Sequence, residues 1–220
     1  MGLRGEAAVV IWGEMTGDAA EVDLWYAREH LQERLNIPGF LRARRCVREL
    51  GSPSYFMIYE LSYTSVLTSP AYLERLNNPT PWTKQIMAKA RSGNRTLCKT
   101  VASHGLGIGA YLMTARVETL DGPGSELSAW ITGSLASIAE QPGITGAHLL
   151  HRDTSVVRPD TKERQARQRA DGSSDVVALI EGYDPNAVGA VAKQFPATAK
   201  SVVQIDLYQV AHAAYAEDVR

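Results

Sequence analysis

Two stretches of the sequence, "IPGFLRARRCVRE" (residues 37–49) and "QPGITGAHLLHRD" (residues 141–153), decide the fold, because the second repeats the pattern of the first 104 positions later. Each contains a Pro-Gly pair that ends a helical pattern and precedes a run typical of a strand. A repeat of this length indicates that one structural unit occurs twice in the chain.

The helices that precede the two Pro-Gly pairs repeat at the same interval. Under this shift three apolar residues of the first helix fall on three of the second: Ala27, Leu31 and Leu35 on Ile131, Leu135 and Ala139. Their spacing places each set on one helix face. In the first helix we expect Leu24 to complete this buried stripe.

Each half of the chain shows the order strand, helix, strand, strand, helix, strand. In the first half we expect strands at 7–14, 40–48, within 52–61 and at 96–103, and helices at 21–35, 69–77 and 80–90, the first capped by Asp18 or a neighbour. In the second half we expect strands at 110–119, 144–152, 176–182 and 202–210, and helices at 125–141 and 185–194.

This order is the split βαβ, or ferredoxin-like, unit. Such a unit leaves one face of its sheet bare, and two units can bury these faces against each other. Strands such as "AAVVIW" and "VVALIEGY" are nearly continuous apolar runs, as expected when both faces are covered. The sequence therefore predicts an α+β protein in which tandem units, residues 1–105 and 106–220, form one intramolecular α+β barrel.

Two segments interrupt the repeat. Residues 155–174 carry five Lys or Arg residues and no aromatic residue. A solvated, mobile insertion is favoured there, and a basic lid or a nucleic-acid arm is the alternative. The second segment, residues 77–94, brings Trp82, which could cover a cleft.

Composition limits the function classes. The chain has 220 residues, of which 45% are hydrophobic, and a net charge of -1, so no global field attracts nucleic acid or an anionic membrane. It shows neither a signal-peptide pattern nor an apolar run of membrane-spanning length, which favours the cytoplasm. Cys46 and Cys98 are expected to be buried free thiols. The expected partner is a small molecule, and the protein is expected to be a monomer or a homodimer.

Four stretches together resemble a known family: "WYAREHL" (25–31), "IPGFLRARR" (37–45), "SPSYFMIYEL" (52–61) and "SPAYLERL" (69–76). They are similar to the EthD-like branch of the dimeric α/β-barrel superfamily, in a fused, two-unit form. The resemblance covers most of residues 5–105 and, more faintly, 106–215. It implies a barrel of paired units, and its members include cofactor-free monooxygenases, isomerases, polyketide cyclases and haem enzymes.

His30 is the first candidate for chemistry. On an ideal helical wheel it lies at the border of the apolar stripe, beside Tyr26 and Arg34. The 104-residue shift places Ser134 at the position of His30 and Ile138 at that of Arg34, so this polar cluster belongs to one copy only. A solvent or interface histidine is favoured, and an acid/base group is the alternative.

Further candidates surround His30 or follow it on strands. Tyr59 would act with His30 as a hydrogen-bonding partner. Candidate ligand-binding residues are Trp25, Tyr26, Arg34, Arg42, Arg44, Tyr55 and Trp82. Alternation puts Arg42 and Arg44 on one strand face, and Tyr55 and Tyr59 on one face of the next strand. For each residue alone, arginines at strand ends and tyrosines in the core are the favoured interpretation.

The first functional hypothesis is a cofactor-independent enzyme of monooxygenase, isomerase, cyclase or dehydratase type acting on a small aromatic or polyketide-like compound. Whether the protein is an enzyme stays open, and a non-catalytic ligand-binding or stress-associated barrel is the alternative. No metal-ligand spacing occurs, so neither metal nor cofactor is expected. A haem-binding barrel is a second alternative, with His148, His151 or His212 as axial ligand.

Overall fold

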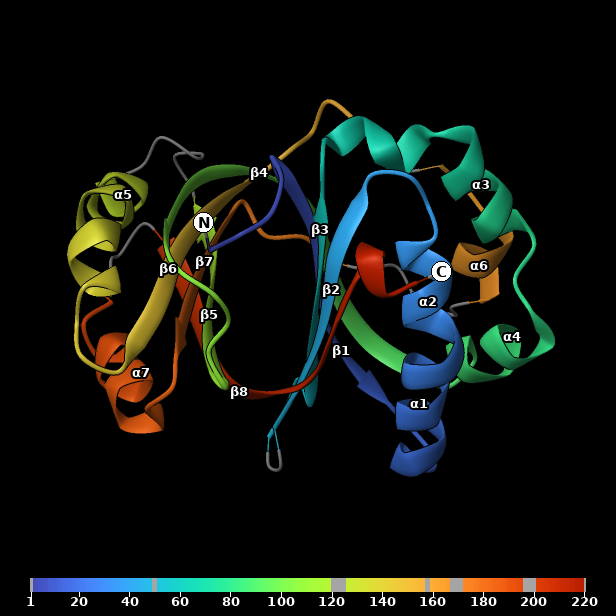
Figure 1. Ribbon diagram of the computed structural model, residues 1–220, viewed down its shortest axis with the longest axis horizontal. Helices are drawn as coiled ribbons and strands as arrows, with labels where there is room; N and C mark the ends of the chain where they lie inside the picture. The colour runs from blue at the N-terminus through green and yellow to red at the C-terminus, as the bar shows by residue number, and fades with distance from the viewer. Residues whose placement is uncertain are drawn as a thin grey trace.

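The computed structural model describes residues 2–48, 51–119, 126–156, 159–166, 172–195 and 201–219. Its eight strands form one closed barrel in the order β1-β3-β2-β8-β5-β7-β6-β4. Helices lie outside the barrel on two opposite sides (Figure 1), with α5 and α7 on one side and α1 to α4 and α6 on the other. The predicted α+β barrel within one chain is confirmed.

The first half, up to Gly105, contains strands β1 (Ala7–Met15), β2 (Phe40–Val47), β3 (Tyr55–Leu61) and β4 (Ala90–Gly105). Its helical segments are α1 (Ala19–Trp25), a π-helical turn (Tyr26–His30), α2 (Leu31–Leu35), a 3₁₀ turn (Thr64–Thr68), α3 (Pro70–Asn77) and α4 (Pro81–Met87). Asp18 caps α1 as expected, because its side chain accepts a hydrogen bond from the backbone N–H of Ala20.

The second half contains strands β5 (Tyr111–Thr119), β6 (Ile144–Arg152), β7 (Val176–Gly182) and β8 (Ser201–Tyr215). Its helices are α5 (Glu126–Ala139), α6 (Lys162–Ala166) and α7 (Pro185–Ala192), and a 3₁₀ turn (Ala216–Asp218) follows β8. The 3₁₀ turn of the first half and α6 were not expected, and β4 and β8 are longer than their apolar runs indicated.

The repeat has the predicted register. β1 and β5 begin at Ala7 and Tyr111, 104 positions apart, and β2 and β6 begin at Phe40 and Ile144, again 104 apart. In both turns the glycine of the Pro-Gly pair has a positive φ, +95° at Gly39 and +90° at Gly143. Glycine adopts this conformation at little cost, which explains why the same pair recurs.

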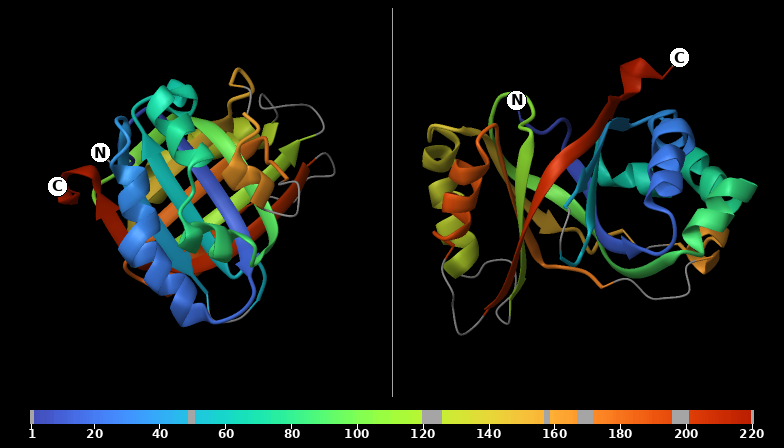
Figure 2. Two further views of the ribbon diagram at one scale, coloured as in Figure 1. Left: turned by 90° about the vertical axis from the view of Figure 1, so that its right-hand side faces the viewer. Right: turned by 90° about the horizontal axis from the view of Figure 1, so that it is seen from below.

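Two seams close the barrel, and each joins the halves. β2 pairs with β8, and β4 pairs with β6, both antiparallel. The long strands β4 and β8 therefore leave their own half and add to the sheet of the other. Figure 2 shows the two sheets between the outer helical layers.

Three apolar cores result. One fills the barrel between the sheets and includes Trp12, Phe56 and the free thiols of Cys46 and Cys98, as expected for these cysteines. The other two lie between each sheet and its helices. No helix in the described ranges is long and apolar enough to cross a membrane.

The barrel also contains a buried charge cluster near one end. Arg44 places Nη1 2.7 Å from Glu181 Oε2 and Nη2 3.2 Å from Glu60 Oε1, and Arg42 Nε lies 2.7 Å from Glu60 Oε1. His148 adjoins Glu181, with Nε2 3.2 Å from Oε1. The favoured expectation of arginines at open strand ends is thus wrong for Arg44, which is fully buried (0% exposed).

The charge cluster predicts a specific acid sensitivity. Burial works to raise the pKa of Glu181, but Arg44 and His148 outweigh it and lower the pKa to about 2, from an ordinary value of 4.5. Because the folded-state pKa is depressed, this stabilisation is complete above about pH 4.5 and is lost as the pH falls toward 2. We expect Tm to fall with acidification in this window, and to fall less steeply in Glu181→Gln. Parallel Tm profiles for the two proteins would contradict this, and the exposed-site variant Glu74→Gln is the control.

Candidate functional site

A π-helical turn orients the first helix of the chain. Residues Tyr26–His30 form this turn between α1 and α2. A π turn contains more residues than an α turn, so the side chains near it leave the ideal wheel. Leu24, expected in the buried stripe, is 51% exposed, whereas Trp25, Tyr26 and His30 are buried against the sheet.

The indole of Trp25 is fixed by a polar network to α4. Trp25 Nε1 donates to Glu29 Oε1 and to Thr83 Oγ1, each at 3.2 Å. The hydroxyls of Thr80 and Thr83 also donate to Glu29 Oε1, at 2.6 and 2.9 Å. The network holds the π turn against the start of α4, the segment that sequence analysis associated with a cleft cover.

Aromatic rings surround the imidazole of His30. Its ring centroid lies 4.2 Å from that of Trp25, 5.5 Å from that of Tyr26 and 6.2 Å from that of Tyr59. His30 is only 6% exposed. The favoured interpretation of His30 as a surface histidine is therefore wrong, because the π turn rotates it inward.

His30 lines a cavity between the sheet and the helices of the first half. This inner chamber has about 300 Å³ of space, its open mouth included. Its lining residues come from β1, the first helix, β3 and more distant segments: Val9, Ile11, His30, Arg34, Phe40, Tyr59, Tyr72, Arg95 and Glu163.

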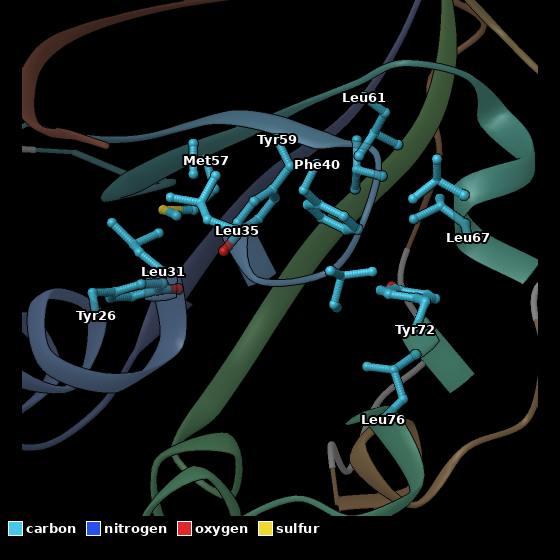
Figure 3. Close-up of a cluster of buried hydrophobic side chains, with 14 of the residues drawn as sticks. Tyr26, Leu31, Leu35, Phe40, Met57, Tyr59, Leu61, Leu67, Tyr72 and Leu76 are labelled. Atoms are coloured by element: carbon cyan, nitrogen blue, oxygen red, sulfur yellow. The ribbon is translucent and has the colours of Figure 1, made fainter. Parts of the chain in front are cut away.

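An outer chamber of about 500 Å³, open mouth included, adjoins the inner one and shares Tyr72, Arg95 and Glu163 with it. Its other lining residues are mostly apolar: Leu67, Leu76, Leu97, Val156, Pro159, Thr161 and Arg164. Figure 3 shows Phe40 between Tyr59 and Tyr72, with Leu67 and Leu76 on either side of Tyr72. The two chambers form one site with a polar interior and an apolar entrance.

The segment of α6 closes one side of this site. Although α6 belongs to the second half, it packs against α3 and α4 of the first, as Figure 1 shows. Thr161 and Glu163 are buried, and Val156 and Ala166 contact the first-half core. The expectation of a wholly solvated insertion is thus wrong for residues 159–166. Residues 157–158 and 167–171 of the insertion lie outside the described residues.

A buried ion pair joins α6 to the first helix. Arg34 Nη2 donates to Glu163 Oε2, and both side chains are almost fully buried. Burial works to lower the pKa of Arg34, but the Glu163 carboxylate raises it above its usual value. Nearby, Arg95 Nη2 donates to the Tyr72 hydroxyl at 3.1 Å.

The structure brings some of the predicted site residues together and separates others. His30, Tyr59 and Arg34 line the inner chamber, with Trp25 and Tyr26 packed behind His30. Arg42 and Arg44 lie inside the barrel, on the other face of the sheet, and do not line either chamber.

Two further candidates are near the site without lining it. Tyr55 shares the core face of β3 with Tyr59, but it lies at the opposite end of that strand. Trp82 is half-buried on α4 and packs against the same core.

Sequence analysis missed Arg95 and Glu163. Arg95 lies on a strand that was expected to begin only at residue 96, and Glu163 lies in the insertion. No sequence signal singled out Glu163, because the insertion also contains Asp160 and Asp171 and nothing in it indicated a distant partner.

The equivalent place in the second half is apolar. Ile131, Leu135 and Ile138 of α5 are buried there with Val188 and Val191 of α7. The 104-residue shift puts Ile138 at the position of Arg34, so a methyl-bearing side chain replaces the guanidinium. In the first half, by contrast, this place holds the polar inner chamber.

The histidines proposed for haem do not fit that group. His148 is enclosed in the barrel, between Ser103 Oγ at 2.9 Å and Glu181. His151 Nε2 lies 3.0 Å from Ser128 Oγ, and His212 is half-exposed on β8; none of the three lines a chamber. No metal-binding cluster of His, Cys, Asp or Glu occurs among the described residues.

Comparison with solved structures identifies the fold. An anthrone oxidase-like protein matches with a TM-score of 0.65 and 13% identity, over 97% of this chain and 94% of that one. A candidate monooxygenase from Lactobacillus acidophilus NCFM matches with a TM-score of 0.53 and 10% identity, over 97% of both chains. A candidate chlorite dismutase matches with a TM-score of 0.52 and 12% identity, also over 97% of both.

No protein-family model matches the sequence, and a search of curated proteins gave no match. The structural matches show that the chain has the dimeric α/β-barrel fold, with both halves of the barrel in one polypeptide.

Proposed function

We propose that the protein is a cofactor-independent enzyme that acts on a small aromatic or polyketide-like molecule in the first-half cavity. The observation that carries this proposal is one site that joins a histidine, tyrosines and arginines behind an apolar entrance. Such a combination of apolar walls with a few convergent polar groups is typical of small-molecule sites. The reaction belongs to the monooxygenase, isomerase, cyclase or dehydratase type.

The chemistry begins with a proton transfer to His30. A neutral imidazole accepts a proton from a phenol, or from a carbon beside a carbonyl group. The broken bond leaves its electron pair on the substrate as a phenolate or enolate. The Tyr59 hydroxyl donates a hydrogen bond to that oxygen, and the Arg34 cation stabilises the negative charge. Trp25, fixed by Glu29 and Thr83, keeps the imidazole in place.

The similarity to an anthrone oxidase-like protein supports this substrate class, since an anthrone is a fused aromatic ring system with a carbonyl group. We also propose that the chain belongs to the EthD-like branch, because the stretches that carry that resemblance build the helix, turn and strands around the cavity. A cytoplasmic location and a small-molecule partner complete the proposal.

The proposal is tested by turnover under air. The purified protein is incubated with anthrone, simple naphthols and β-keto aromatic compounds, while oxygen uptake and products are followed by an oxygen electrode and mass spectrometry. We expect saturable turnover of at least one compound without added cofactor. Saturable binding without any turnover would contradict the enzyme and support the non-catalytic ligand-binding barrel.

A further inference from the structure

We infer that the ligand of the first-half cavity is an aromatic carboxylate, whose anionic group binds between Arg34 and Arg95 while its rings occupy the apolar outer chamber. This inference rests on the proposed function only for the location of the site, and it adds the charge of the ligand. It follows from the charge balance of the lining residues, from the hydrogen bonding of the two arginines and from the apolar lining of the entrance.

The lining of the two chambers carries more positive than negative charge. Three arginines, Arg34, Arg95 and Arg164, face one carboxylate, that of Glu163. Inside the barrel the charges of one cluster are matched, because Arg42 and Arg44 pair with Glu60 and Glu181. An unbalanced set of cations around a cavity favours an anionic occupant.

The hydrogen bonding of Arg34 is incomplete. Its Nη2 donates to Glu163, but Nη1 is buried and finds no acceptor among the residues that the structure describes. Leaving a buried charged donor unpaired is costly. A carboxylate oxygen entering the inner chamber would supply the acceptor, and the Glu163 carboxylate shows that such a group fits beside this guanidinium.

Arg95 lies at the junction of the two chambers. Its Nη2 donates to the neutral Tyr72 hydroxyl, and it forms no ion pair with any described residue. Its charge is therefore available to a ligand. Two guanidinium groups that flank one carboxylate provide the charge-assisted hydrogen bonds that bind such groups tightly.

The apolar lining of the outer chamber indicates the chemistry of the part of the ligand that does not carry the charge. Leu67, Leu76 and Leu97 line this chamber together with Val156 and Pro159 of the insertion. Flat rings fit between such walls, whereas a small free anion would gain nothing from them. The site therefore fits fused rings that carry a carboxylate.

The test compares two probes of nearly equal shape. Binding of 2-naphthoate and of 2-naphthamide to the full chain is measured by isothermal titration calorimetry at low and moderate salt. We expect 2-naphthoate to bind at least about 10-fold more tightly, because only the acid carries the charge. Equal affinities, tighter binding of the amide, or no binding of either probe would overturn the inference.

A matched pair of variants locates the anion. Arg34 is too deeply buried for a clean substitution, so Arg95→Gln is used, with the exposed Lys84→Gln as a control that loses the same charge outside the cavity. We expect Arg95→Gln to weaken 2-naphthoate binding by about five-fold or more and to leave 2-naphthamide unchanged. Lys84→Gln should alter neither affinity, and an equal loss in both variants would overturn the assignment.

These titrations involve no turnover, so they separate the inference from the proposed function. A clear preference for 2-naphthoate in a protein that turns over no compound would support the inferred carboxylate ligand and contradict the proposed enzymatic function. Turnover of neutral anthrone with no preference for the acid would do the reverse.

Discussion

His30→Gln is expected to lower kcat by about 10²- to 10⁴-fold for any compound that the protein turns over, with a small change in KM. Glutamine occupies a similar volume and keeps hydrogen-bonding capacity, but it cannot take a proton near neutral pH. Phe40 and Tyr59, which line the inner chamber, remain, so the substrate still binds. Steady-state kinetics of the two proteins, measured side by side, give the two constants separately.

The matched control is His104→Gln, because His104 is exposed on β4 and lines neither chamber. This variant should keep the kcat and the KM of the unmodified protein. Thermal denaturation of both variants verifies that they are folded. A folded His30→Gln protein with more than about a tenth of the original kcat would show that another group performs the proton transfer.

Arg44→Met is expected to reduce the free energy of unfolding by about 3–5 kcal/mol, the largest stability effect that we predict. The substitution keeps most of the volume but removes the cation that lies between Glu60 and Glu181. Glu181 then remains buried without its main counter-charge, and an uncompensated buried charge is strongly destabilising. Chemical denaturation with guanidinium chloride measures the loss.

Two further variants serve as controls for Arg44→Met. Arg44→Met combined with Glu181→Gln should recover part of the stability, because both members of the pair are then neutral. Arg4→Met removes an exposed arginine that pairs with Glu217, and it should leave the stability nearly unchanged. If Arg44→Met were as mild as Arg4→Met, the cluster would contribute little to the stability of the barrel.

The architecture could be predicted from the sequence because it depends on features that recur. The turns at Pro38-Gly39 and Pro142-Gly143 require a residue with positive φ, which glycine adopts at little cost. The strands require apolar residues on both faces. These requirements are local, so they are visible along the chain. The predicted lengths of β4 and β8 were too short, because pairing with the other half extends these strands beyond their apolar runs.

The site was harder to predict, for two physical reasons. A single π turn changes the direction of the side chains around it, and a wheel of fixed angle therefore placed Leu24 inside and His30 at the border. The second reason is distance along the chain. Glu163 reaches Arg34 from 129 positions away, through a segment whose composition indicated only solvation.

The contrast between a polar cavity in one half and an apolar filling in the other has an evolutionary consequence. In a pair of identical subunits, every mutation is present twice, so any change that favours a reaction must also be tolerated in the second subunit. Here a substitution at position 30 leaves position 134 as it was. One copy can acquire reactivity while the other preserves stability, a division of labour that two identical subunits do not permit.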